Sequence, residues 1–206
     1  MSEDETNNNQ LNLLPEKIQE LTEKIKVCAF RHFNENGFAA VSMDMVAKEL
    51  HISKKTIYKV FHRKEDILEK IIDEKLGEIE ISFNTKLREN SKTEQLPLFA
   101  PHYHLFRNWG SAVLIQEIKE TIPVLFEKII AFRKRVFEDT FSILLQELKE
   151  TEKADFDLPA EKLSAYFFNF LDTIPETDNP DAAATLILRG LKKKKPKKEK
   201  KKKKKK

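Results

Sequence analysis

Apolar residues recur every three or four positions over most of this 206-residue chain, a spacing typical of helices that bury one face. This pattern predicts a helix over 16–36 and short helices that begin after the capping residues Ser42 and Ser53. A fourth helix is predicted to begin near Lys64. The expected fold is therefore all-α, with an N-terminal three-helix head.

The rest of the chain shows a longer and less regular helical pattern. Residues 90–101 contain two prolines and are expected to form a loop, and 102–120 an irregular helix. Two short apolar helices are expected at 160–173 and 181–191. The clearest period predicts one helix over 123–149, with its apolar positions at Leu125, Ile129, Phe132, Val136, Thr140, Leu144 and Leu148.

Charge is distributed unevenly along the chain. The net charge of +4 includes residues 192–206, with 13 Lys and one Glu, which leaves −8 for the other 191 residues. Within this acidic part, residues 51–64 contain five Lys or Arg and no Asp or Glu. Such a run is common on a solvated helix face, but here it falls on a short helix that closely follows another.

Two short helices joined by a tight turn, the second of them basic, are typical of a helix-turn-helix that binds DNA. The second helix fits the major groove, where its first residues reach the base edges. Ile57 and Phe61 are expected to face the core of the head. The predicted DNA-binding residues are Ser42, Ser53, Lys54, Lys55, Thr56, Tyr58, Lys59, His62 and Lys64.

The run GFAAVSMDMVAKELHISKKTIYKVFHRKEDIL, residues 37–68, resembles the DNA-binding head of the TetR family of bacterial repressors. The shared positions include Phe38, Ser42, Val46, Ala47, Ile52, Ser53, Thr56, Ile57, Tyr58, Phe61, Lys64, Glu65, Asp66 and Ile67. The resemblance implies that Ser42, Thr56, Tyr58 and Lys64 contact phosphates. It also implies that Lys54, Lys55 and Lys59 approach the bases.

Two residues depart from the family pattern. His51 stands in the turn where the family usually has glycine, and a positive φ at a non-glycine residue costs about 1 kcal/mol. Lys55 stands near the start of the second helix, where the family often has Gly or Pro. A long cation at this position is expected to alter the preferred DNA site without abolishing binding.

The resemblance implies an all-helical body that holds an apolar ligand cavity and forms a homodimer through its last two helices. The alternative for the dimerisation residues is that they close the core of the monomer, and the alternative for the ligand residues is simple core packing. The expected dimerisation residues are Leu163, Phe167, Phe170, Leu186 and Leu191. The candidate residues for a small apolar ligand are Phe99, His102, Tyr103, Phe106 and Trp109.

Enzyme and metal motifs are not found in the sequence, so we expect no catalytic residues, no cofactor and no metal site. His102 and His104 diverge on a helix and form a weak metal signal, and Cys28 is expected to be a small packed residue. A single cysteine, an acidic polar N-terminus and the lack of a long apolar run favour a cytoplasmic protein that does not contact the membrane.

The chain is thus expected to contain four parts: a disordered arm (1–15), a helix-turn-helix domain (16–75), a helical regulatory and dimerisation domain (76–191) and a disordered lysine-rich tail (192–206). The expected function is that of a dimeric repressor, released by a small ligand from a palindromic double-stranded DNA operator. The alternative is a non-specific nucleic-acid-binding protein that acts through its lysine tail. The tail could equally be a solvating segment or a feature of the gene end.

Overall fold

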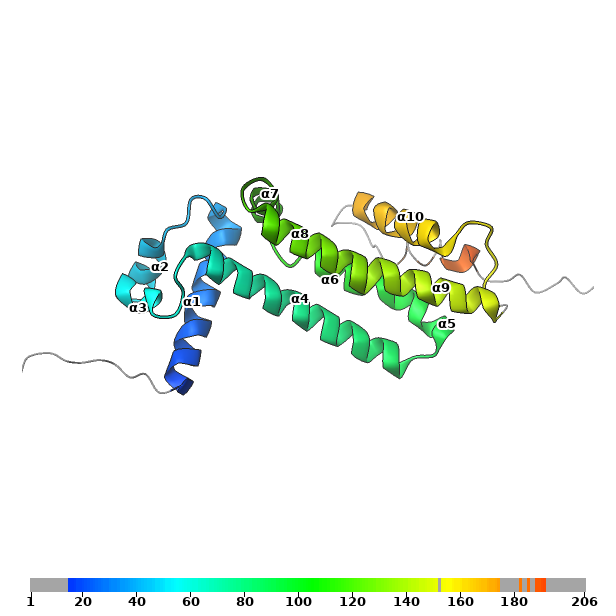
Figure 1. Cartoon of the computed structure of the whole chain (residues 1–206), viewed down its shortest axis with the longest axis horizontal. Helices are drawn as coiled ribbons and strands as arrows, with labels where there is room; N and C mark the ends of the chain where they lie inside the picture. The colour runs from blue at the N-terminus through cyan, green and yellow to red at the C-terminus, as the bar shows by residue number, and fades with distance from the viewer. Residues whose placement is uncertain (1–14, 152, 175–181, 183–184, 186–187, 192–206) are drawn as a thin grey trace, which may run out of the picture. The chain divides into compact units, whose positions relative to one another are not determined.

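The computed structural model describes residues 15–151, 153–174, 182, 185 and 188–191, and every regular element in these residues is helical (Figure 1). The all-α prediction is confirmed. The expected disordered arm (except Pro15), the lysine tail and Leu186 lie outside the described residues. Among the described helices, none is long and apolar enough to cross a membrane.

The helices follow one another with short connections. A 3₁₀ turn, Leu96–Leu98, precedes α6, and a π-helical segment, Arg133–Asp139, joins α8 to α9. The helices are α1 (Pro15–Asn36), α2 (Met43–Glu49), α3 (Lys54–Tyr58), α4 (Lys64–Glu89), α5 (Lys92–Gln95), α6 (Phe99–Arg107), α7 (Ala112–Thr121), α8 (Pro123–Phe132), α9 (Thr140–Glu150) and α10 (Ala160–Thr173).

The described chain divides into two compact units. The N-terminal unit contains the residues up to 75 together with 110–128, and the C-terminal unit contains 76–109 and the residues from 129 onward. Helix α7 thus belongs to the N-terminal unit, where it packs against α1. The domain boundary expected at residue 75 had placed this helix in the regulatory domain.

The core of the N-terminal unit joins α1 to the helices that follow it. Ile25, Ala29 and Phe33 of α1 are buried, but Ile18, which belongs to the same sequence stripe, is exposed. The other buried apolar side chains of this unit include Phe38, Val41, Met43, Val46, Ala47, Ile57, Phe61, Ile67, Leu68, Ile71, Ile72, Leu114, Ile118 and Leu125.

Two residues with positive φ end the first two helices of this unit. Gly37 ends α1 with a φ of 82°, and Phe38 then packs back on Phe33 with 5.2 Å between the ring centroids. His51 follows α2 with a φ of 53°, so the expectation that it occupies the usual position of a glycine is confirmed.

Polar contacts tie α7 and the α1–α2 loop together. The backbone N–H of Ser111 donates to Asn34 Oδ1 of α1 at 2.6 Å. Glu117 of α7 accepts from the backbone N–H of Ala39 at 3.0 Å, and its carboxylate lies against Gly37. These contacts restrain the loop that leads into α2.

The core of the C-terminal unit is aromatic. The helix expected over 123–149 is observed as α8, the π-helical segment and α9, and each of its predicted apolar positions is buried except Thr140, which is half-buried. Leu125 belongs to the N-terminal unit, and the positions from Ile129 onward belong to the C-terminal unit. From Phe132 onward these positions are spaced by four residues. In an α-helix each four-residue step turns the face by about 40°, so the wider π-helical turn at 133–139 helps to keep the positions on one side.

The prediction of a loop over 90–101 is wrong. This segment contains α5, the 3₁₀ turn and the start of α6. Pro97 lies at the start of the 3₁₀ turn and Pro101 in the first turn of α6, where a backbone N–H has no helical partner to lose. The two prolines therefore start helices here instead of interrupting them.

Replacing Gly37 should destabilise the protein, and Gly77 supplies a matched control. A Cβ on Gly37 would meet the Glu117 carboxylate at 2.7 Å in a backbone with positive φ, whereas nothing lies within 4 Å of a Cβ on the helical Gly77. Gly37→Ala should lower the free energy of unfolding by about 1–2 kcal/mol, and Gly77→Ala should raise it by up to about 1 kcal/mol. Urea unfolding measures both, and equal effects would contradict the account.

Candidate nucleic-acid interface

Serine caps define the two short helices of the head. Ser42 Oγ accepts a hydrogen bond from the backbone N–H of Met45 at the start of α2, at 3.3 Å. Ser53 Oγ accepts one from the backbone N–H of Thr56 at the start of α3, at 3.1 Å. Both expected caps are confirmed, and each satisfies a backbone donor that has no partner within its helix.

Helix α3 separates apolar from cationic side chains. Ile57 is fully buried, and Phe61 just beyond the helix is also buried. Thr56 is half-buried, with its hydroxyl oxygen 2.8 Å from that of Ser53. The exposed side chains of the helix and its C-cap are Lys54, Lys55, Tyr58 and Lys59. The five-residue helix and its C-cap thus present three cations and a phenol to solvent, while Ile57 holds the helix in place.

The three cations of α3 and its C-cap differ in their partners. Lys54 Nζ pairs with Asp44 Oδ2 of α2 at 2.5 Å, and this hydrogen bond raises the pKa of Lys54. Lys55 and Lys59 have no ion pair with any residue that the structure describes. Sequence reasoning did not identify Asp44 as a partner, although an acid in the first turn of α2 is visible in the sequence.

Lys64 contacts the protein itself at the start of α4. Its ammonium group donates to the backbone oxygens of Phe38 at 2.9 Å, Val41 at 3.1 Å and Ala39 at 3.4 Å. It also lies 4.3 Å from the centroid of the Phe38 ring. A lysine has three donors, so these carbonyl groups engage all of them, and a phosphate contact by Lys64 stays a prediction.

Asp66 organises the turn between α3 and α4. Its carboxylate accepts from the backbone N–H of Arg63 at 3.0 Å and pairs with the Arg63 guanidinium at 3.0 Å. Burial opposes ionisation of Asp66, but the hydrogen bonds from Arg63 outweigh it and hold its pKa below the usual value. His62 of the same turn is exposed, so the turn offers a polar side chain beside α3.

The residues expected to bind a ligand lie in the aromatic core of the C-terminal unit. Phe99, His102, Tyr103, Phe106 and Trp109 are all buried. The Phe99 ring centroid is 4.7 Å from that of Phe141, and the Tyr103 centroid is 4.8 Å from that of Phe168. These side chains fill the space between the helices with one another, as the alternative of core packing predicts.

A pocket of the same unit lies elsewhere, between α4, α5 and α9. It has a volume of about 400 Å³ and is open to solvent. None of the five predicted ligand residues lines it. The lining residues are Asn84, Leu87, Arg88, Asn90, Lys92, Gln95, Thr140, Ile143 and Leu144.

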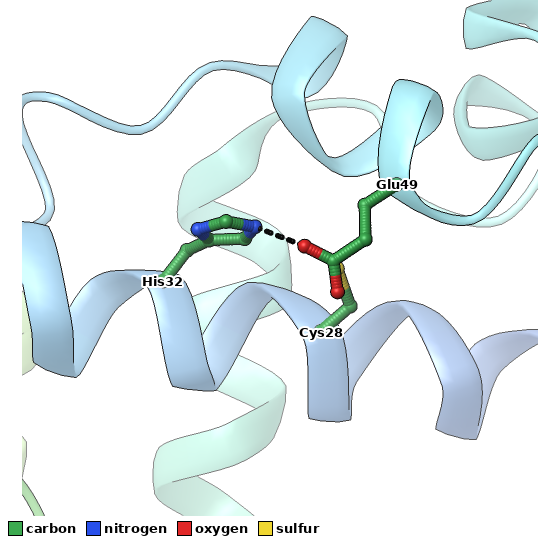
Figure 2. Close-up of side chains that lie close together, drawn as sticks. All are labelled: Cys28, His32 and Glu49. Atoms are coloured by element: carbon green, nitrogen blue, oxygen red, sulfur yellow. Dashed lines mark hydrogen bonds and ion pairs between the residues drawn. The ribbon is translucent and has the colours of Figure 1, made fainter.

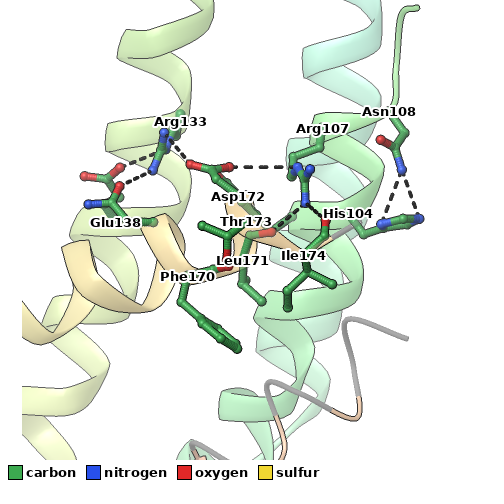
Figure 3. Close-up of polar contacts among 12 residues, drawn as sticks. His104, Arg107, Asn108, Arg133, Glu138, Phe170, Leu171, Asp172, Thr173 and Ile174 are labelled. Carbon is green, nitrogen blue, oxygen red and sulfur yellow. Dashed lines mark hydrogen bonds and ion pairs between the residues drawn. The ribbon is translucent and has the colours of Figure 1, made fainter. Parts of the chain in front are cut away.

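A polar network closes the C-terminal end of α10. Asp172 accepts a hydrogen bond from the Tyr103 hydroxyl at 2.7 Å and pairs with Arg133 Nη1 at 3.0 Å. Arg107 donates to the backbone oxygens of Leu171 and Ile174. Its Nε lies 3.9 Å from Asp172 Oδ1, so Asp172 lies between two arginines (Figure 3). Burial and the hydrogen bond to Asp172 raise the pKa of Tyr103. This network orders the helix end and engages the Tyr103 hydroxyl, one of the polar groups predicted for a ligand.

The expected dimerisation residues of α10 fall on two faces. Phe167 is buried in its own chain and stacks on Phe141 with 4.6 Å between centroids. Leu163 is half-buried and Phe170 is 39% exposed. Tyr166, which was not expected, is 59% exposed on the same face as these two, because 163, 166 and 170 follow the helical spacing. Leu191 is also buried.

Comparison with known sequences identifies the head. A family model described as bacterial regulatory proteins, tetR family, matches residues 27–71. This range contains the end of α1, both short helices and the first turns of α4. No curated protein matches the sequence.

Solved structures share the fold over most of the chain. A TetR family transcriptional regulator from Cytophaga hutchinsonii is similar with a TM-score of 0.68 and 17% identity, over 87% of this chain and 98% of that one. The TetR family regulator PfmR from Thermus thermophilus has a TM-score of 0.63 and 24% identity, over 82% and 99%. A structure named superantigen pfit reaches a TM-score of 0.66 with 18% identity, over 84% and 89%. At these identities the likeness shows the fold alone.

The role of Lys64 can be tested through stability. Lys64→Met removes three hydrogen bonds to loop carbonyls and should lower the free energy of unfolding by about 1–3 kcal/mol in urea denaturation. Lys59→Met is the control, since Lys59 is exposed and has no ion pair with a described residue. If both variants unfold at the same urea concentration as the parent, the loop contacts do not stabilise the head.

Proposed function

The chain is a TetR family transcriptional regulator by its DNA-binding domain, and we propose that it is a homodimeric repressor that binds a palindromic operator and is released by a small ligand. The observation that carries the proposal is the partition of α3. Ile57 is buried, while Lys54, Lys55 and Tyr58 of this short helix and Lys59 at its C-cap are exposed.

The proposed roles of these residues follow from their contacts. Lys55 and Lys59 are the proposed base-reading residues, because their ammonium groups pair with no described residue. Lys54 would first have to leave Asp44, so we assign it a smaller contribution. Ser42, Ser53, Thr56, Tyr58 and His62 are proposed to position the helix on phosphates.

Dimerisation is proposed through the exposed face of α10, defined by Leu163, Tyr166 and Phe170. These apolar side chains follow the spacing of one helix face, and a twofold axis would bring the same face of two copies together. Two heads are needed because half-sites of a palindrome lie about 34 Å apart, farther than one recognition helix reaches.

The ligand is proposed to bind in the 400 Å³ pocket of the C-terminal unit. The aromatic cluster of the core would have to open before it could admit a molecule, whereas the pocket is open and has polar walls. Arg88 favours a ligand with an acidic group, whereas Lys92 already pairs with Glu147 at 2.8 Å. Leu87 and Leu144 can contact the apolar part of the ligand.

Footprinting with the full chain tests the function. At moderate salt the protein should protect two half-sites about one helical turn apart in the DNA upstream of its own gene, and it should bind this DNA more tightly than random duplex. Equal affinity for both duplexes would contradict the proposal.

Matched variants separate base reading from general attraction. Lys59→Ala should weaken operator binding by roughly 5- to 150-fold, since a good base contact is worth about 1–3 kcal/mol. Lys86→Ala, which removes a lysine paired with Glu89 on α4, should leave binding unchanged. Deleting 192–206 should lower affinity for all duplexes alike and keep the preference. Complete loss of binding in the deletion would favour the lysine-tail alternative.

The dimer can be tested on the exposed face of α10. Phe170→Asp should convert the dimer to a monomer in sedimentation velocity and leave the chain folded, because Phe170 is 39% exposed in the monomer. Ile81→Asp on α4, where the side chain is 71% exposed, is the control and should not change the oligomeric state. A parent protein that sediments as a monomer would exclude the proposed dimer.

A further inference from the structure

Three side chains of types that commonly bind metals meet between α1 and the end of α2. Cys28 and His32 are four residues apart on α1, so they share one face of the helix. Glu49 is the last residue of α2. The thiol sulfur, a ring nitrogen and a carboxylate oxygen all lie within 4.8 Å of one another, and Figure 2 shows Cys28 and His32 directed toward Glu49.

These groups already form a polar cluster with neighbouring residues. His32 Nε2 lies 2.7 Å from Glu49 Oε2, and the Arg31 guanidinium pairs with the other oxygen of Glu49. Burial, together with a hydrogen bond to Glu49, raises the pKa of the Cys28 thiol to about 11. The Glu49 carboxylate therefore contacts the Cys28 thiol, the His32 imidazole and the Arg31 guanidinium. A cation bound there would replace its hydrogen bonds to Cys28 and His32.

We propose that Cys28, His32 and Glu49 form a binding site for a divalent transition-metal ion, with zinc as the preferred ion. Thiolate, imidazole and carboxylate are the three ligand types that zinc takes from proteins, at bond lengths of about 2.0–2.3 Å. Such bonds place tetrahedral ligand atoms about 3–4 Å apart, and the three atoms already lie within 4.8 Å. The Glu49 side chain is 40% exposed, so it has room to turn toward a bound ion.

The surroundings of the cluster fit a site with three protein ligands. Cys28 is buried and the His32 side chain is mostly buried, so two ligands are held in place by packing, while the exposed side of Glu49 leaves a fourth position for water. Arg31 opposes a cation, but it also pairs with Glu35 at 3.2 Å and keeps that partner when Glu49 turns. Mg²⁺ and Ca²⁺ prefer oxygen ligands, so the thiol and the imidazole disfavour them.

The bound ion would connect α1 to the end of α2, two residues before His51. This connection is distinct from the proposed DNA contacts of α3, since none of the three ligands belongs to that helix. The proposal of a metal site therefore does not depend on the proposal of an operator, and it is tested without DNA.

Cobalt(II) is the direct probe for this site, with the full chain carrying no affinity tag. The chain has one cysteine, so a thiolate-to-cobalt charge-transfer band can come only from Cys28. We expect the band to saturate at one Co²⁺ per chain, to disappear when Zn²⁺ is added and to persist in excess Mg²⁺. Cys28→Ser should abolish the band. His32→Gln and Glu49→Gln should each weaken cobalt binding by at least tenfold, whereas the control His104→Gln should match the parent.

A second measurement covers variants that fold poorly. Zn²⁺ should raise the thermal midpoint of the parent and of His104→Gln, and it should not raise that of His32→Gln. A parent protein without the charge-transfer band and without the zinc-dependent rise would overturn the site. A band of undiminished affinity in folded His32→Gln and Glu49→Gln would also overturn it, because the thiol would then bind cobalt alone.

Discussion

A five-residue helix has no stability of its own in water, so α3 is held entirely by what it packs against and by its cap. Ile57 supplies the packing and Ser53 the cap, while Phe61 anchors the turn that leads into α4. Lys54 adds an ion pair to Asp44 of α2, whereas Lys55 and Tyr58 are exposed and are not needed to hold the helix. That is why a short run can carry several cations on a chain whose first 191 residues are acidic overall.

The supports of α3 extend through the N-terminal unit. Lys64 fixes the start of α4 to the loop that precedes α2, and Glu117 of α7 fixes the same loop from another side. Helix α7 follows α6 in sequence but shares its core with α1, through Leu114 and Ile118. The N-terminal unit therefore includes residues 110–128, which pack with α1 although they lie far from it in the sequence.

Most features of the head could be predicted from neighbouring residues in the sequence. The role of each residue in the body depends instead on which face of its helix other helices cover, and this is not visible in the sequence. Both serine caps and the positive φ of His51 follow from neighbouring residues, so the sequence was sufficient there. The loop expected over 90–101 was wrong because proline starts a helix as readily as it ends one. Phe167 and Phe170 are one turn apart on α10, yet the first lies in the core and the second on the surface. The aromatic residues near 99–109 were compatible with either a ligand cavity or a packed core. Which of the two forms depends on how closely the neighbouring helices approach, and here the rings pack against one another.

We propose that α3 and its C-cap read the DNA sequence, while the other DNA-binding residues of the head contact phosphates. Amide NMR spectra of the full chain, bound in turn to its operator and to a duplex of the same composition in scrambled order, test this most directly. The account predicts that the amide shifts which differ between the two complexes concentrate in residues 53–59. Identical spectra for the two duplexes, with changes from the free protein confined to 192–206, would contradict it.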